Sequence, residues 1–133
     1  MVGKQFINPP GLARPRGYTH VVTSHVGKTV YVAGQVARNA KGEIVGRNDL
    51  RRQAEQAYEN LKVALGAAGA SLADVVKLNV YIVNFKPEDR EVQREVRSRY
   101  FGQEHLPAST LIGVQALAEQ ELLIEVEAIA VLE

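Results

Sequence analysis

The chain has 133 residues, of which 46% are hydrophobic and 23% are charged. This length and composition are typical of one soluble domain and exclude a disordered or collagen-like chain. Sixteen Lys and Arg residues against fifteen Asp and Glu residues leave a net charge of +1, too little for strong sequence-independent attraction to nucleic acid or an anionic membrane. Because the sequence has no cysteine, disulfides, thiolate zinc sites and cysteine nucleophiles are excluded, which suits a cytoplasmic protein.

The organisation of the chain predicts a single domain over residues 1–133, because no linker, repeat or low-complexity segment interrupts it. No apolar segment approaches the ~20 residues that cross a bilayer, so no membrane partner is expected. Residues 1–17 contain three prolines and three glycines and lack the apolar core of a signal peptide. We therefore expect an irregular N-terminal arm there.

The sequence after the arm predicts two β-strands. Residues 20–24 and 29–33 are rich in β-branched and aromatic side chains, and a short segment containing Gly27 separates them. This pattern is typical of a β-hairpin.

A long amphipathic helix comes next, and it is the clearest element of the sequence. Apolar residues recur at steps of three and four from Leu50 to Ala68. Asn48 or Asp49 can cap its first turn, and Gly69 stands where a glycine commonly ends a helix.

The second half of the chain predicts a strand over 74–83, a shorter helix from Pro87 to near Gly102, and strands over 110–114 and 122–131. The element order is therefore ββαβαββ. Such an order favours an α+β fold, a two-layer α/β sandwich in which two helices cover one face of a mixed sheet.

The other face of this sheet is expected to be partly apolar and partly polar. In the last strand, one side carries two carboxylates between large aliphatic residues, and neighbouring strands add aromatic and amide groups to the same face. These residues are Leu123, Glu125, Glu127, Ile129 and Val131, with Tyr31, Asn79 and Tyr81. Since this surface is too apolar for open water, we expect a self-associating face with a polar cleft.

Familiar catalytic motifs are absent from the sequence. It contains no G-x-S-x-G elbow, H-E-x-x-H helix, phosphate-binding loop or dinucleotide fingerprint. The spacing of His20, His25 and His105 does not support a shared metal, so no metal site is expected.

A basic stripe runs along the second predicted helix. Arg90, Arg94 and Arg97 recur at helical spacing, with Glu91 and Glu95 interleaved. The interleaved glutamates favour a solvated, salt-bridged face over a nucleic-acid surface.

Several stretches in a fixed order resemble the reactive-intermediate deaminase family, called Rid and formerly YjgF. They are Gly17-Tyr18, Tyr31-Val-Ala-Gly-Gln35, the stretches 53–62 and 67–77, Pro107-Ala108, and Ile124-Glu-Val-Glu-Ala-Ile-Ala130. The resemblance implies a chorismate-mutase-like fold and a homotrimer whose sheets form a central barrel, with a small-molecule cleft at each subunit boundary. It further implies hydrolysis of enamines and imines to 2-oxo acids and ammonia, with no metal or cofactor.

The resemblance also implies roles for individual residues. Tyr18 corresponds to the family's cleft tyrosine, Gly34 to a glycine whose backbone approaches the ligand, and Glu125 to a carboxylate that positions water. The family's carboxylate-binding arginine falls at Ser109, whose neutral hydroxyl cannot form a bidentate, charge-assisted pair. Typical imino-acid hydrolysis is therefore expected to be weak or absent.

Two arginines of the arm offer another source of anion recognition. Arg14 and Arg16 precede Tyr18 closely, and an extended chain at ~3.3–3.6 Å per residue leaves them within ~15 Å of the predicted cleft. We therefore expect Arg14 or Arg16, rather than Arg94, to bind whatever anionic group the ligand carries.

Three functions remain open on the sequence, including whether the chain is an enzyme. The leading one is hydrolysis of a small imine or enamine. The main alternative is a non-catalytic trimeric protein that binds or senses a small molecule. A distant third is ribonuclease activity or translation inhibition, against which the near-zero net charge weighs.

Overall fold

The computed structural model describes residues 3–133. Along the chain the strands are β1 (Lys4–Ile7), β2 (Val21–Ser24), β3 (Lys28–Gln35), β4 (Val75–Val83), β5 (Ala108–Val114) and β6 (Ile124–Leu132). The helices are α1 (Leu50–Ala67) and α2 (Pro87–Tyr100), with a short 3-10 turn, η1 (Leu72–Asp74), before β4.

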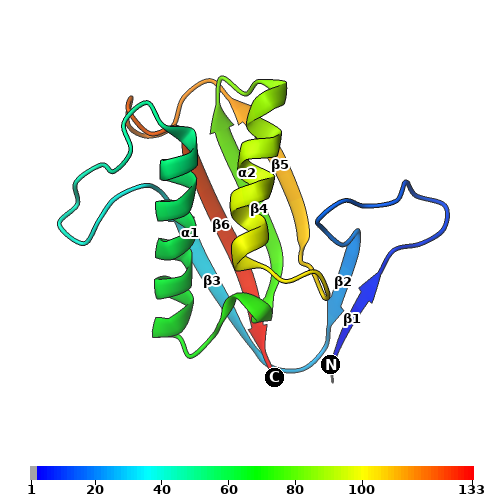
Figure 1. Ribbon diagram of the computed structural model, residues 1–133. Helices are drawn as coiled ribbons and strands as arrows, with labels where there is room; N and C mark the ends of the chain where they lie inside the picture. Colours follow the sequence, from blue (N-terminus) through cyan, green and yellow to red (C-terminus); the bar gives the residue numbers. More distant parts are fainter. Residues whose placement is uncertain (1–2) are drawn as a thin grey trace.

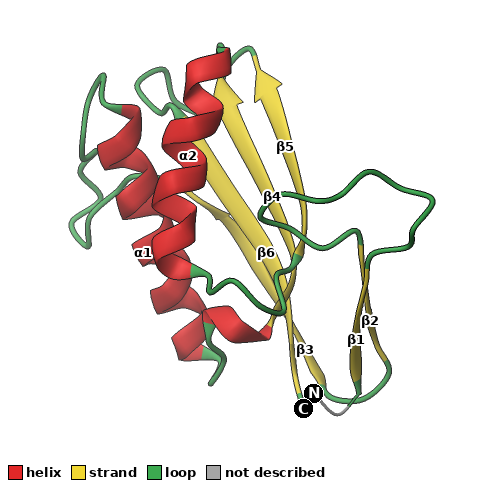
Figure 2. Cartoon of the chain, turned by 45° about the vertical axis from the view of Figure 1, so that its right-hand side comes forward, coloured by secondary structure: helices red, strands yellow, loops and turns green. Residues whose placement is uncertain are grey.

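Four of the strands form one mixed sheet in the order β3-β6-β4-β5. Strand β6 is antiparallel to both β3 and β4, whereas β5 is parallel to β4. Both helices lie on the same face of this sheet (Figures 1 and 2). The predicted α+β fold with two helices on a mixed sheet is therefore confirmed.

The predicted hairpin of the first two strands is wrong. Strand β2 pairs with β1 in a separate two-stranded ribbon, and β3 pairs with β6 instead. The reason is burial: β2 is largely exposed, whereas Val30 and Val32 of β3 pack against the main core. The arm is likewise not irregular throughout, since Lys4–Ile7 forms β1.

Helix α1 begins at Leu50, as predicted, and ends at Ala67, one residue before the predicted end. The Asp49 side chain accepts a hydrogen bond from the Arg52 backbone N–H at 3.1 Å and caps the first turn. At the other end, Gly69 has φ +79°, and the Ala70 N–H donates to the Leu65 carbonyl at 2.9 Å. Within residues 3–133, neither helix is long and apolar enough to cross a membrane.

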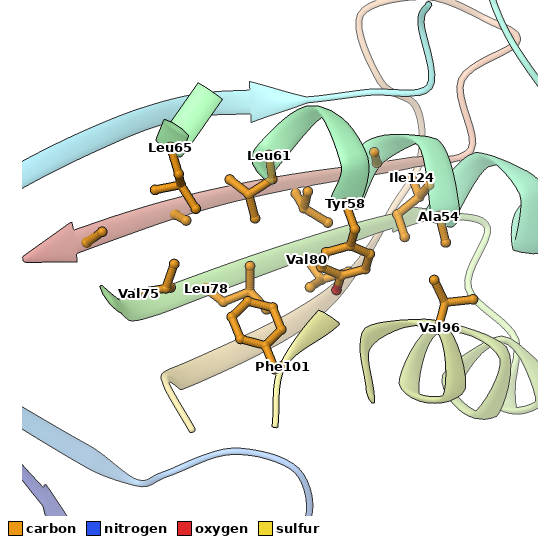
Figure 3. Close-up of a cluster of buried hydrophobic side chains, with 14 of the residues drawn as sticks. Ala54, Tyr58, Leu61, Leu65, Val75, Leu78, Val80, Val96, Phe101 and Ile124 are labelled. Atoms are coloured by element: carbon orange, nitrogen blue, oxygen red, sulfur yellow. The ribbon is translucent and has the colours of Figure 1, made fainter. Parts of the chain in front are cut away.

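The core lies between the helices and the helix-facing side of the sheet (Figure 3). Its fully buried side chains come from α1, β4, β6 and α2, and they include Tyr58, Leu61, Leu65, Leu78, Val80, Ile82, Val96, Ile124 and Val126. The Tyr58 hydroxyl donates to Gln93 Oε1 at 2.6 Å, so this buried hydroxyl is paired. In β4 and β6 buried residues alternate with half-buried ones along most of each strand, and a register shift between Val75 and Lys77 interrupts the alternation at the start of β4.

A buried glutamine fixes the approach to β6. Gln53 of α1 donates to the carbonyls of Gly46 and Glu121 at 3.2 and 2.9 Å, and it accepts from the Leu123 N–H at 2.8 Å. Gln53 is fully buried, and these hydrogen bonds satisfy its amide group in the absence of water. They fix the backbone two residues before Glu125.

Candidate functional site

A cavity of about 270 Å³ lies between the loop that joins β1 to β2, helix α2 and strand β5. The loop, residues 8–20, is called the arm loop below, and it lies beside β5 (Figure 2). We call this space the arginine cavity, and its lining residues are Arg16, Tyr18, Phe85, Arg90, Gln93, Arg94, Arg97, Ser109 and Leu111.

The arm loop is fixed to the start of β5 by Thr19. The Thr19 N–H donates to the Pro107 carbonyl at 3.0 Å, and its hydroxyl donates to the Leu106 carbonyl at 2.5 Å. Thr19 is 4% exposed and forms a parallel bridge with Ala108. As a result, Tyr18 and Ser109 line the same cavity although most of the chain separates them.

A second contact fixes the arm loop to α2. Gly17 has φ +76°, and a methyl group on its Cα would overlap the guanidinium of Arg97. Any other L-residue would therefore meet both an unfavourable backbone conformation and a steric clash. Glycine at this position lets the backbone of the arm loop lie directly on the Arg97 side chain.

Arg97 is largely buried, at 9% exposure, and burial lowers its pKa from the usual arginine value. Within residues 3–133 it forms no ion pair with a carboxylate. The prediction of a solvated, salt-bridged stripe is therefore wrong for Arg97. The interleaved Glu95 points elsewhere, since it pairs with Arg51 of α1 at 2.6 Å and with Arg99 at 2.8 Å.

The two arm arginines lie in different places. Arg16 and Arg94 both line the arginine cavity. The structure therefore does not separate the two residues as the earlier expectation did. Arg14 instead lines a neighbouring cavity with Phe6 and His105.

Glu125 and Gly34 form a separate group on strands β6 and β3. A methyl group on the Cα of Gly34 would overlap the Glu125 carboxylate, so the carboxylate lies directly against the Gly34 backbone. Burial, followed by repulsion from Glu127, raises the pKa of the Glu125 carboxyl above its ordinary value.

Glu127 is held by two neighbours on the same face of the sheet. It accepts hydrogen bonds from the Tyr81 hydroxyl at 2.5 Å and from the Asn79 amide at 3.2 Å. The bond to Glu127 raises the pKa of Tyr81, because it stabilises the protonated phenol. A negative charge is therefore fixed beside Glu125.

Within one chain, the two groups do not meet. Ser109 pairs in register with Leu78, whose side chain faces the helices, whereas Glu125 pairs with Tyr81 on the opposite face. The strands β3 and β5 are also opposite edges of the sheet. Sequence reasoning thus named members of both groups, called half-sites below. It assigned Arg90 and Arg97 to a solvated stripe outside the site and did not single out Gln93, although all three line the arginine cavity.

Replacing Gly34 by Ala tests the contact with Glu125. We expect the new methyl group to displace the carboxylate toward water, so that the pKa of Glu125 in Gly34→Ala falls toward the ordinary glutamate value of ~4.3. NMR titration of the Glu125 carboxyl measures this. The control is Gly66→Ala in α1, where a methyl group meets no atom within 4 Å. A raised Glu125 pKa that persists in Gly34→Ala would contradict the contact.

Possible metal ligands do not gather at either half-site. No group of three potential metal-ligating side chains occurs in the part of the chain that the structure describes. The charged side chains at these two places are the arginines of the arginine cavity and the neighbouring carboxylates of Glu125 and Glu127 on β6.

Comparisons with known proteins agree with the fold. The family model described as Endoribonuclease L-PSP matches residues 11–132. The chain is 35% identical to a 2-iminobutanoate/2-iminopropanoate deaminase of Dermatophagoides farinae, across 100% of both chains. It is 43% identical over 106 residues to a RutC family protein of Pyrococcus abyssi, covering 79% of this chain and 80% of that protein.

A solved structure extends the likeness to the arrangement of the elements. The crystal structure of YyfB from Yersinia pestis, a Rid family protein of unknown function, has a TM-score of 0.91 and 44% identity. The superposition covers 98% of this chain and 100% of that one. With the family model matching nearly the whole chain and full-length relatives above 30% identity, the chain belongs to the Rid (YjgF) family.

Proposed function

We propose that the protein hydrolyses a small imine or enamine. An enamine first tautomerises to the imine, and water adds to the carbon of the C=N bond while Glu125 takes a proton from that water and gives it to the imine nitrogen. The hydroxyl proton of the resulting carbinolamine then passes through the same carboxylate to the amine nitrogen as the C–N bond breaks, so that a carbonyl compound and ammonia leave. The observation that carries this proposal is the contact of the Glu125 carboxylate with the Gly34 backbone, which holds a partly desolvated base in place.

The similarity to a protein named 2-iminobutanoate/2-iminopropanoate deaminase supports the same reaction class. The proposed reaction uses only water and side chains. Tyr18 and Ser109 would offer hydroxyl groups to the substrate from the arginine cavity.

We further propose that the site is completed by a second copy of the chain in a homotrimer. Since the two half-sites lie on opposite edges and opposite faces of the sheet, a head-to-tail ring would bring Glu125 of one copy to the arginine cavity of the next. The exposed Tyr31 and Ile112 on the helix-free face support such an assembly, because burial would remove this apolar surface from water. Light scattering should give a trimer, and a monomer at micromolar concentration would overturn this assignment.

The test of the reaction is a coupled assay. A lyase generates an imine in situ, and the release of the 2-oxo acid is followed with and without the protein. We expect acceleration that Glu125→Gln abolishes, and weak turnover of monocarboxylate imines because Ser109 lacks the bidentate charge of an arginine. Ser109→Arg should then raise turnover of those imines. No acceleration with any imine would overturn the proposed hydrolysis.

The second candidate function is small-molecule binding without turnover, and the neutral Ser109 is the observation that favours it. This function predicts that small anions stabilise the protein against heat while no imine is hydrolysed. The description Endoribonuclease L-PSP applies to the family model, and a cavity of about 270 Å³ fits a metabolite better than an RNA strand. Cleavage of a labelled RNA that Glu125→Gln abolishes would favour that third function.

The raised pKa of Glu125, caused first by burial and then by repulsion from Glu127, predicts the pH dependence of the reaction. Because Glu125 must be ionised to act as a base and its pKa is raised, activity should fall on the acid side at a higher pH than an ordinary glutamate would give. Glu127→Gln removes the repelling charge, so the acid limb of kcat/KM should move to lower pH. Initial rates corrected for the uncatalysed reaction measure this. An acid limb that stays in place or moves upward would exclude Glu127 as a cause.

A further inference from the structure

The arginine cavity holds more positive charge than a single carboxylate needs. Four of its nine lining residues are arginines, and none is an aspartate or glutamate. Arg16 comes from the arm loop, and Arg90, Arg94 and Arg97 come from α2. Two elements far apart in the chain therefore place their cations around one small space.

Protein carboxylates balance little of this charge. Arg94 pairs with Glu91 at 3.1 Å, but the Glu91 side chain is 72% exposed, so water weakens this pair. Within residues 3–133, Arg16, Arg90 and Arg97 form no ion pair. Water screens the exposed Arg16 and Arg90 in part, but guanidinium groups stay protonated and Arg97 is buried, so an anion in the cavity would relieve the repulsion among these like charges.

The burial of Arg97 strengthens this reasoning. Its guanidinium lies against the Gly17 backbone at 9% exposure, with no carboxylate paired to it. A buried charge is stable when it is paired and hydrogen-bonded. The arm loop thus covers a cation whose counter-charge the described residues do not supply.

The number of donors indicates the charge of the missing partner. One carboxylate offers about four lone-pair positions, which one or two guanidinium groups can fill, whereas each arginine presents five N–H donors. Four arginines exceed this demand, and the hydroxyl groups of Tyr18 and Ser109 add further donors. A ligand with a second anionic group would use them.

We propose that the arginine cavity binds a small molecule with two anionic groups on a short carbon skeleton, either a dicarboxylate or a carboxylate that also bears a phosphate. Phe85 and Leu111 would contact the skeleton, and the volume of about 270 Å³ limits its length. The inference has two parts. The claim that the preferred imine substrate carries a second acidic group rests on the proposed function. The claim that the cavity binds dianions does not depend on whether the protein turns over any substrate.

Calorimetric titration of the intact protein with three probes tests this inference. The probes are butanoate with one carboxylate, succinate with two, and 2-phosphoglycolate with a carboxylate and a phosphate. We expect at least one dianion to bind about tenfold or more tightly than butanoate, and its affinity to fall as salt increases. Preference for succinate or for 2-phosphoglycolate distinguishes the two sources of the second charge.

Variants assign the binding to the cavity. Arg90→Gln and Arg16→Gln remove exposed cavity arginines without disturbing the core, and each should weaken dianion binding about tenfold or more while butanoate changes less. Arg99→Gln is the matched control, because it removes the same charge from the same helix but pairs with Glu55 and Glu95 outside the cavity. Arg97→Lys extends the series at the buried position.

The outcomes separate this inference from the proposed function. Dianions that bind no more tightly than butanoate, or that lose as much affinity in Arg99→Gln as in Arg90→Gln, would overturn the inference even if imines are hydrolysed. Tight dianion binding without hydrolysis of any imine would support the inference and overturn the proposed function.

Discussion

Glu125→Gln is expected to lower kcat/KM for imine hydrolysis by about 10²–10⁴-fold, the usual contribution of a general acid or base. Glutamine keeps the size of the side chain and its contact with Gly34 but cannot accept the proton of water. Steady-state rates in the coupled assay measure the loss. Glu43→Gln, an exposed carboxylate in the loop before α1, is the matched control and should leave the rate unchanged.

The stability of this variant provides an independent check. Since the folded-state pKa of Glu125 is raised, the folded protein holds this proton more tightly than the unfolded chain. Ionising Glu125 therefore disfavours folding, and this disadvantage grows as pH rises from the ordinary glutamate pKa of ~4.3 through the raised value. Glu125→Gln should melt no lower than wild type at neutral pH. A loss of activity that accompanies a large drop in melting temperature would indicate a structural role instead.

Leu61→Ala is expected to destabilise the protein by about 2–5 kcal/mol, the range for emptying a fully buried leucine site. Leu61 is 0% exposed and lies in the core between α1 and the sheet (Figure 3). The loss combines the burial free energy of the methyl and methylene groups that are removed with the cost of the cavity that they leave in the core. Denaturant unfolding at one fixed protein concentration measures it, because an assembling protein gains stability with concentration.

The control for this substitution lies on the same helix. Val63 is 70% exposed, so Val63→Ala should change the free energy of unfolding by no more than about 0.5 kcal/mol. Equal losses in the two variants would show that the core does not lie where the structure puts it.

The elements that could be predicted from sequence are those whose cause is local. Helix α1 carries its own periodicity, its Asp49 cap and its terminal Gly69, and the alternation of β4 and β6 is likewise contained within each strand. Strand pairing is not local. Residues 20–24 are rightly strand-like, but their partner is β1, which lies in a segment rich in glycine and proline.

The same distinction between local and non-local causes applies to the residues of the site. Ser109 and Glu125 could be named because short motifs resemble those of a family, whereas the burial of Arg97 depends on Gly17, from the far end of the chain. The interleaved Glu95 suggested a solvated stripe, yet its carboxylate is engaged by Arg51 of the neighbouring helix. Helical spacing gives the face on which a residue lies but not which element covers it.

The central position of β6 in the sheet affects how the chain can fold during synthesis. Strand β6 is the last along the chain, yet it lies between β3 and β4 and pairs with both. A nascent chain can form α1, α2 and the parallel pair of β4 and β5, but β3 has no partner until β6 has left the ribosome. Until then, the apolar side chains of β3 that pack on the core in the folded protein have no neighbouring strand. An unfinished chain that lacks β6 therefore exposes apolar surface and is prone to aggregation.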